Sequence, residues 1–189
     1  MFNFDPTAIG TKGDQHHKYV LNKILEIGCL DKDPRPHYAD GTPAHTLSYN
    51  GEFCQYDISK GEFPIVTLRP IATKSAIGEL LWIYQDQTTN LDVLKHKYGV
   101  DWWSPWALDE GGNTIGQCYG ATVRKHNIMD KLLDGIKSDP DGRRHIIDLW
   151  QYDDFNYPHG LKPCAFLSIY NVRHRKDGID YLDAILVIR

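Results

Sequence analysis

Two strand-like runs at the end of the sequence constrain the fold of this chain most strongly. Residues 164–174 (CAFLSIYNVRH) and 179–189 (IDYLDAILVIR) are rich in β-branched and aromatic residues, and Lys176-Asp177-Gly178 between them is a strong hairpin signal. A doubly wound fold would instead need long crossovers between parallel strands. We therefore expect a mixed or largely antiparallel sheet.

Three further segments carry apolar residues at helical spacing and predict helices. They are residues 14–28 with Gly28 as the C-terminal cap, residues 73–88, and residues 126–142. In the second helix we expect one broad buried face, formed by Ile77, Leu80, Leu81 and Tyr84.

Together with the remaining segments, these elements predict an α+β fold, in which a mixed or largely antiparallel sheet packs with helices. Residues 30–45 predict a long loop, residues 46–59 a strand with a turn or bulge at Asn50-Gly51, and residues 143–151 another strand. We expect one domain that covers residues 1–189.

Composition excludes several classes of protein. The net charge of −4 argues against a DNA-binding protein, and no apolar run reaches the length of a membrane span, so we expect no DNA or membrane partner. Four cysteines occur without CxxC spacing, so we expect no metal. Since the N-terminus lacks a signal peptide, we expect free thiols and a cytoplasmic location.

Cys164 follows Pro163 at the start of a predicted strand. Strand alternation would place Cys164, Phe166, Ser168 and Tyr170 on one face. A buried structural cysteine is one reading. The other is a reactive thiol, which needs nearby positive charge to hold the thiolate; the candidate cations are Arg143, Arg144 and Arg189.

The adjacent Arg143 and Arg144 precede a predicted strand. They are either a solvated loop end or a phosphate clamp, because guanidinium groups bind phosphate oxygens in pairs. Neighbouring strand residues point to opposite faces, so the two arginines would grip different partners unless the backbone twists first.

Aromatic and acidic side chains supply further candidates. Trp102, Trp103 and Trp106 form either a flat wall for a ring-shaped ligand or a local hydrophobic cluster. Tyr119 could supply a phenolic hydroxyl nearby. Glu79, within an apolar helix, is either a hydrogen-bonded core carboxylate or a proton-transfer group.

Six motifs, in order along the chain, resemble those of the thymidylate synthase family. They are GTPAHTLS (41–48), ELLW (79–82), WWSPW (102–106), GQCYG (116–120), GRRHIIDLW (142–150) and Pro163-Cys164. Ala165 stands where most of the family has histidine, as in a branch that lacks it, and Gly41 stands where the family has a loop arginine.

The resemblance implies a folate-dependent methylation of deoxyuridine monophosphate (dUMP). By that reading the Cys164 thiolate adds to pyrimidine C6, and C5 then attacks the one-carbon unit of the co-substrate 5,10-methylenetetrahydrofolate, giving thymidine monophosphate (dTMP) and dihydrofolate. Glu79 and Tyr119 would serve proton transfer, and Trp103 and Trp106, with Glu79, would lie on the folate side.

The same resemblance assigns the arginines and a homodimer. Arg189 would bind the phosphate in its own subunit and lower the thiol pKa, whereas Arg143 and Arg144 would reach the phosphate in the neighbouring subunit's site. Both side chains would then grip a partner outside their own subunit.

Family members continue past Arg189, so we expect this chain to represent the N-terminal two thirds of the family domain and to have little synthase activity alone. Two other functions stay open: a deoxypyrimidine-monophosphate hydroxymethylase, which uses the same thiol and folate, and a truncated nucleotide-binding relative without catalysis.

Overall fold

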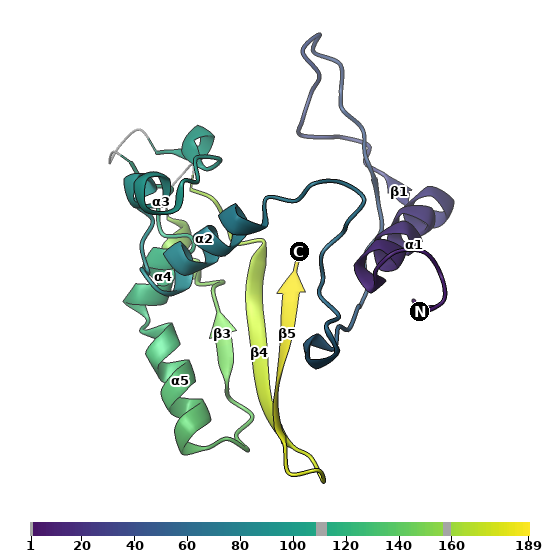
Figure 1. Cartoon of the computed structure of the whole chain (residues 1–189). Coiled ribbons are helices and arrows are strands. Elements are labelled where there is room, and N and C mark those ends of the chain that lie inside the picture. Colours follow the sequence, from purple (N-terminus) through teal and green to yellow (C-terminus); the bar gives the residue numbers. More distant parts are fainter. Residues whose placement is uncertain (1, 109–112, 157–159) are drawn as a thin grey trace. The chain divides into compact units, whose positions relative to one another are not determined.

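The computed structural model describes residues 2–108, 113–156 and 160–189 (Figure 1). The chain divides into two compact units, Met1–Ile71 and Ala72–Arg189, and each is described by itself. The expectation of one domain over the whole chain stays a prediction.

The first unit contains one helix and a minimal sheet. Helix α1 (Lys12–Ile27) ends at Gly28, whose N–H donates to the Ile24 carbonyl at 2.9 Å, so the predicted helix and cap are confirmed. Strand β1 (Cys29–Leu30) pairs antiparallel with β2 (Leu47–Ser48). The strand predicted over residues 46–59 is mostly wrong, because pairing stops at Ser48. At the predicted turn or bulge, Gly51 does have a positive φ of +89°.

A buried carboxylate, Asp14, holds the start of α1 to the end of this unit. Asp14 completes a capping box with Thr11, and its oxygens accept hydrogen bonds from the N–H and hydroxyl of Thr67, each at 2.6 Å. The hydrogen bond from the Thr67 hydroxyl is the main reason that the pKa of Asp14 lies well below its usual range.

The second unit is organised by a three-stranded antiparallel sheet. Its strands are β3 (Ile146–Asp148), β4 (Ala165–His174) and β5 (Asp180–Ile188), in the order β3-β4-β5 (Figure 1). The predicted hairpin is confirmed: Gly178 has a φ of +79°, and its N–H donates to the Arg175 carbonyl at 3.0 Å. The α+β prediction with an antiparallel sheet is confirmed as well.

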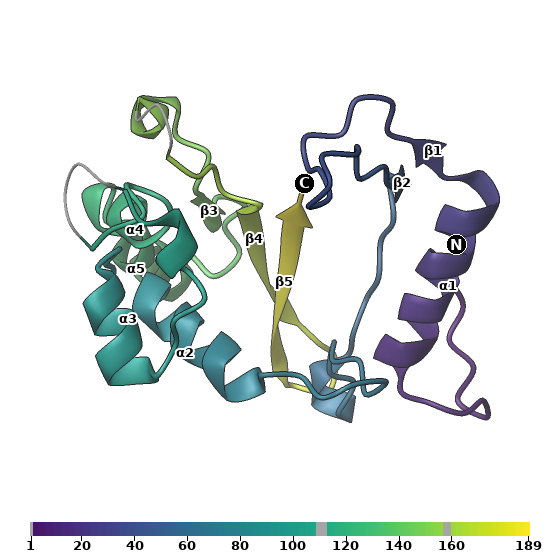
Figure 2. The ribbon, with the colours of Figure 1, turned by 90° about the horizontal axis from the view of Figure 1, so that it is seen from above.

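Four helices lie together on the β3 side of this sheet, as both views show (Figures 1 and 2). They are α2 (Thr73–Tyr84), α3 (Leu91–Tyr98), α4 (Gly120–Lys125) and α5 (Ile128–Ser138). The sequence analysis predicted α2 and α5 only. Helix α3 nevertheless carries local signals, since the Asn90 side chain caps its start and Gly99 ends it with a φ of +69°.

Helix α2 buries a different face from the one predicted. Ile77 and Leu80 are more than half exposed, whereas Gly78, Trp82 and Ile83 are buried. Gly78 explains the difference, because a Cβ there would lie 3.0 Å from the Cβ of Tyr98 in α3. The close helix contact thus forms over a glycine, which a count of large apolar residues overlooks.

Trp82 is the largest fully buried side chain of the core, and its indole Nε1 donates to the Asn90 carbonyl at 2.9 Å. We predict that Trp82→Phe lowers the free energy of unfolding by about 1–3 kcal/mol, because it leaves a void and an unpaired carbonyl. The matched change Trp106→Phe, at a half-exposed site, should shift it by less than about 0.5 kcal/mol. Chemical denaturation measures both, and equal losses would contradict this account of the core.

Candidate active site

The Cys164 thiol is exposed, which excludes the reading of a buried structural cysteine. Cys164 lies immediately before β4 and is held through its backbone on both sides. Its N–H donates to the Tyr119 hydroxyl at 3.0 Å, and its carbonyl accepts from the Arg189 N–H at 3.1 Å. The backbone position of this thiol is therefore fixed while its sulfur stays accessible.

A β-bulge determines which residue of β5 meets Cys164. Leu167 pairs with Val187 but Ala165 pairs with Ile188, so Phe166 is an extra residue in β4. The predicted one-face alternation from Cys164 to Tyr170 is thus interrupted at Phe166. The same extra residue brings Arg189 beside Cys164, whereas the register of the rest of the hairpin would place it beside Ala165.

The Arg189 guanidinium is held beside the thiol by carbonyls and an aromatic face. Its Nε donates to the Pro163 carbonyl at 3.1 Å, and an Nη donates to the Lys162 carbonyl at 3.2 Å. The group also lies over the ring of Trp150, 5.4 Å from its centroid. The expected cation near the thiol is therefore Arg189, and Trp150, which the sequence analysis did not single out, supports it.

Two neighbouring residues, Cys118 and Tyr119, form the inner wall of the site. Burial is the main reason that the pKa of Cys118 rises to about 12, the nearby Cys164 adds to the rise, and Arg189 opposes it. Burial likewise raises the pKa of Tyr119. Near neutral pH, Cys118 is thus an inert thiol and Tyr119 keeps its phenolic proton.

Glu79 and the three tryptophans lie on the other side of Tyr119. Glu79 is half-buried and accepts a hydrogen bond from Trp102 Nε1, and its charge contributes to the raised pKa of Tyr119. The Trp103 ring lies 5.7 Å from the Trp106 ring and 6.4 Å from the Tyr119 ring, centroid to centroid. Trp103 packs on the core, as a local hydrophobic cluster would, while Trp106 is half-exposed. The reading of these rings as a wall for a ligand stays a prediction.

Arg143 and Arg144 do not join this cluster. Both are exposed, and neither has a hydrogen bond or ion pair to any residue that the structure describes. Ile146 pairs with Ile169, and this register extended places Arg144 opposite Asn171, seven residues along the chain from Cys164 and roughly 23 Å away at about 3.3 Å per residue. The structure therefore separates these arginines from the thiol of their own chain.

Comparison with known proteins decides the family. The family model described as thymidylate synthase matches residues 15–189. The chain belongs to the thymidylate synthase family. It is 53% identical to a thymidylate synthase of Lactococcus lactis subsp. cremoris and 51% identical to one of Streptococcus suis, each over 179 residues and 95% of this chain.

Solved thymidylate synthases have the same fold. The thermostable thymidylate synthase A of Bacillus subtilis superposes with a TM-score of 0.76 at 32% identity, over 91% of this chain and 63% of that chain. The T4 phage thymidylate synthase gives 0.72 at 26% identity, over 92% and 60%. The chain spans 63% of the length of the curated thymidylate synthases named above.

Within residues 2–108, 113–156 and 160–189, three or more histidine, cysteine or acidic side chains nowhere gather in a way that could hold a metal ion. Across the same ranges, the helices are too short or too polar to cross a membrane.

The contrast between the two thiols gives a direct prediction. Brief alkylation with iodoacetamide near pH 8, followed by peptide mass spectrometry, should modify Cys164. The alkylation rate at Cys118 should be at least tenfold lower, because Cys118 is buried and its pKa is about 12. Cys29, which is exposed on the first unit, serves as the accessible control. Equal rates at Cys118 and Cys164 would contradict the geometry of the site.

Proposed function

We propose that the complete protein is a thymidylate synthase, which converts dUMP and 5,10-methylenetetrahydrofolate to dTMP and dihydrofolate. The observation that carries the proposal is the exposed Cys164 thiol, fixed between the Tyr119 hydroxyl and Arg189. The four cysteines are free, which suits the reducing cytoplasm where we place the reaction.

Cys164 is the nucleophile in this proposal. Its thiolate forms a bond to pyrimidine C6, and the electron pair of the C5–C6 double bond moves to C5. Arg189, held against the carbonyls of Lys162 and Pro163, places a positive charge next to the segment that carries this thiol. Tyr119, which keeps its phenolic proton, and Glu79 beside it exchange protons with the base.

The aromatic and apolar side chains around Glu79 fit a flat ring such as a pterin. Trp106 is half-exposed, and Ile77 and Leu80 turn outward from α2. The Trp103 Nε1 is buried and has no hydrogen-bond partner among the described residues, so it is a donor left for a ligand. We assign the folate to this surface, where it supplies the one-carbon unit and the hydride.

The phosphate is assigned to arginines from two subunits. Arg189 uses two of its five N–H groups on backbone carbonyls, which leaves donors for a phosphate oxygen. Arg143 and Arg144 are too far along β4 to share a phosphate with their own Cys164, so we assign them to the site of a partner copy. Exposed apolar residues of β5 support a homodimer: Leu182, Ile185, Leu186 and Ile188.

Covalent capture tests the nucleophile. With the protein at its full natural length, 5-fluoro-dUMP and methylenetetrahydrofolate should form an adduct on Cys164 that survives denaturation. Cys164→Ser should abolish the adduct and leave the thermal midpoint nearly unchanged, because the side chains are nearly isosteric. Cys118→Ser is the matched thiol control and should keep the adduct. Turnover by Cys164→Ser would overturn the assignment.

A subunit-mixing experiment tests the arginines. Arg144→Ala should weaken nucleotide binding by about 1.5–3 kcal/mol, the worth of a charge-assisted contact, whereas Arg175→Ala at the hairpin turn should not. Mixing Arg144→Ala with Cys164→Ser should restore activity, because one site of the mixed dimer then has Cys164 from one copy and Arg144 from the other. If the mixture stays as inactive as its parts, Arg144 does not act across subunits.

A further inference from the structure

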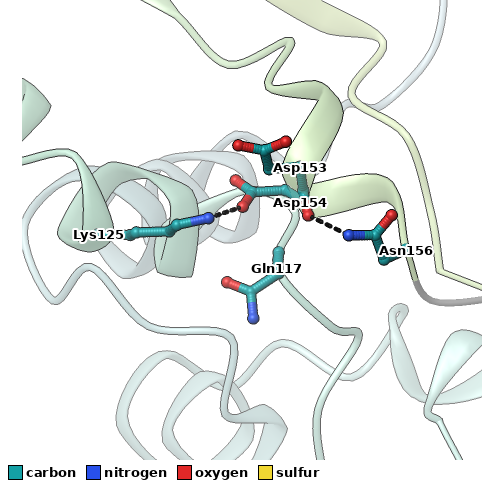
Figure 3. Close-up of a pocket in the computed structure, with 5 residues that line it drawn as sticks. All are labelled: Gln117, Lys125, Asp153, Asp154 and Asn156. Carbon is teal, nitrogen blue, oxygen red and sulfur yellow. Dashed lines mark hydrogen bonds and ion pairs between the residues drawn. The ribbon is translucent and has the colours of Figure 1, made fainter.

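Asp154, which the proposed reaction does not use, is a buried carboxylate next to the site. Only 7% of the residue is exposed. Its two oxygens accept hydrogen bonds from the Thr122 hydroxyl and from Lys125 Nζ, each at 2.6 Å. Figure 3 shows Lys125 reaching Asp154. Both residues line an open hollow of about 380 Å³ together with Gln117, Asp153 and Asn156.

Both donors to Asp154 belong to α4, which begins immediately after Tyr119. Thr122 also closes the turn before the helix, because its N–H and its hydroxyl both approach the Gln117 carbonyl, at 3.1 and 3.3 Å. Gly120 lies so close to the Thr88 backbone that a Cβ would be 2.2 Å from the Thr88 oxygen. The contacts of Asp154 therefore fix the segment that carries the Tyr119 side chain.

Asp154 itself belongs to a short 3-10 helix, Tyr152–Phe155, on the Arg189 side of the site. Phe155 packs against Trp150 with ring centroids 4.9 Å apart, and Trp150 lies under the Arg189 guanidinium. One carboxylate thus links the segment of Tyr119 to the aromatic support of Arg189. Tyr119 and Arg189 are the two residues that hold the Cys164 backbone by hydrogen bonds.

We propose that Asp154 is a positioning residue, which holds α4 so that the Tyr119 hydroxyl stays on the Cys164 N–H. The role of Asp154 in catalysis rests on the proposed function, whereas its role in holding Tyr119 does not, since these contacts involve no nucleotide. Burial alone would raise the pKa of Asp154, but Lys125 and Thr122 outweigh it and hold this pKa below its usual value. Asp154 is therefore a charged anchor at neutral pH.

The groups around Cys164 and Asp154 determine whether replacing Asp154 speeds or slows alkylation of Cys164. Arg189, Tyr119 and Cys118 face Cys164, while Lys125 and His126 face Asp154, the His126 Nε2 at 3.9 Å. If Asp154 acted only through its charge, removing that charge would ease ionisation of the thiols and speed alkylation of Cys164. If it positions Tyr119, removing it takes away the acceptor of the Cys164 N–H, loosens the backbone that carries the thiol, and slows alkylation.

The experiment measures the rate of iodoacetamide alkylation at Cys164 against pH in the 189-residue chain. Asp154→Asn should slow the rate at pH 7 about threefold, an upward shift of the midpoint by about half a pH unit. Tyr119→Phe should give a similar shift, and the double variant should show no further shift, because both changes remove the same interaction. Asp153→Asn removes a charge from the same hollow without touching α4 and should not slow the reaction.

A second variant covers the case in which Asp154→Asn does not fold. Thr122→Val removes one hydrogen bond to Asp154 without changing any charge, and it should slow alkylation in the same direction. Faster or unchanged alkylation in the variants that fold, or a shift that persists in the Tyr119→Phe background, would overturn the proposal. Since no nucleotide is used, failure here is distinguishable from failure of the adduct assay on the wild-type protein.

Discussion

The extra residue in β4 is the constraint on which the rest of the site depends. Along most of the hairpin the register would place Arg189 beside Ala165, one residue past the thiol. The bulge at Phe166 moves the end of β5 by one position, so the Arg189 N–H meets the Cys164 carbonyl instead. The guanidinium then lies over Trp150 and beside the carbonyls of Lys162 and Pro163.

The other side of the thiol is built from segments far apart in the sequence. Tyr119 reaches the Cys164 N–H from the start of a six-residue helix, which is too short to be stable alone. Its position therefore comes from tertiary contacts such as those of Asp154 with Thr122. A fixed thiol backbone with an accessible sulfur follows from these two supports, and both are needed because Cys164 lies outside the regular part of β4.

The sequence predicts the parts of this structure that depend on local signals. The hairpin is one, because Lys176-Asp177-Gly178 specifies the turn and a patterned strand lies on each side of it. Helix α4 and the pairing of Glu79 with Trp102 could not be predicted in this way, since one is held by distant contacts and the other joins residues 23 apart. The candidate residues came from local patterns and from family motifs. Trp150 lies within one of these motifs and Asp154 outside them, and the roles of both required coordinates.

The positions of the arginines follow from the same sheet. Arg189 is held at one end of β4 by contacts with its own chain, so its charge is available to the thiol without further ordering. Arg143 and Arg144 precede β3, several residues along the sheet from Cys164, and they are exposed and without partners among the described residues. Guanidinium groups are strongly favoured where they meet a phosphate, and a single chain offers these two no common ligand with Cys164. In the proposed homodimer, a site completed by a second copy would make assembly a condition for binding the nucleotide.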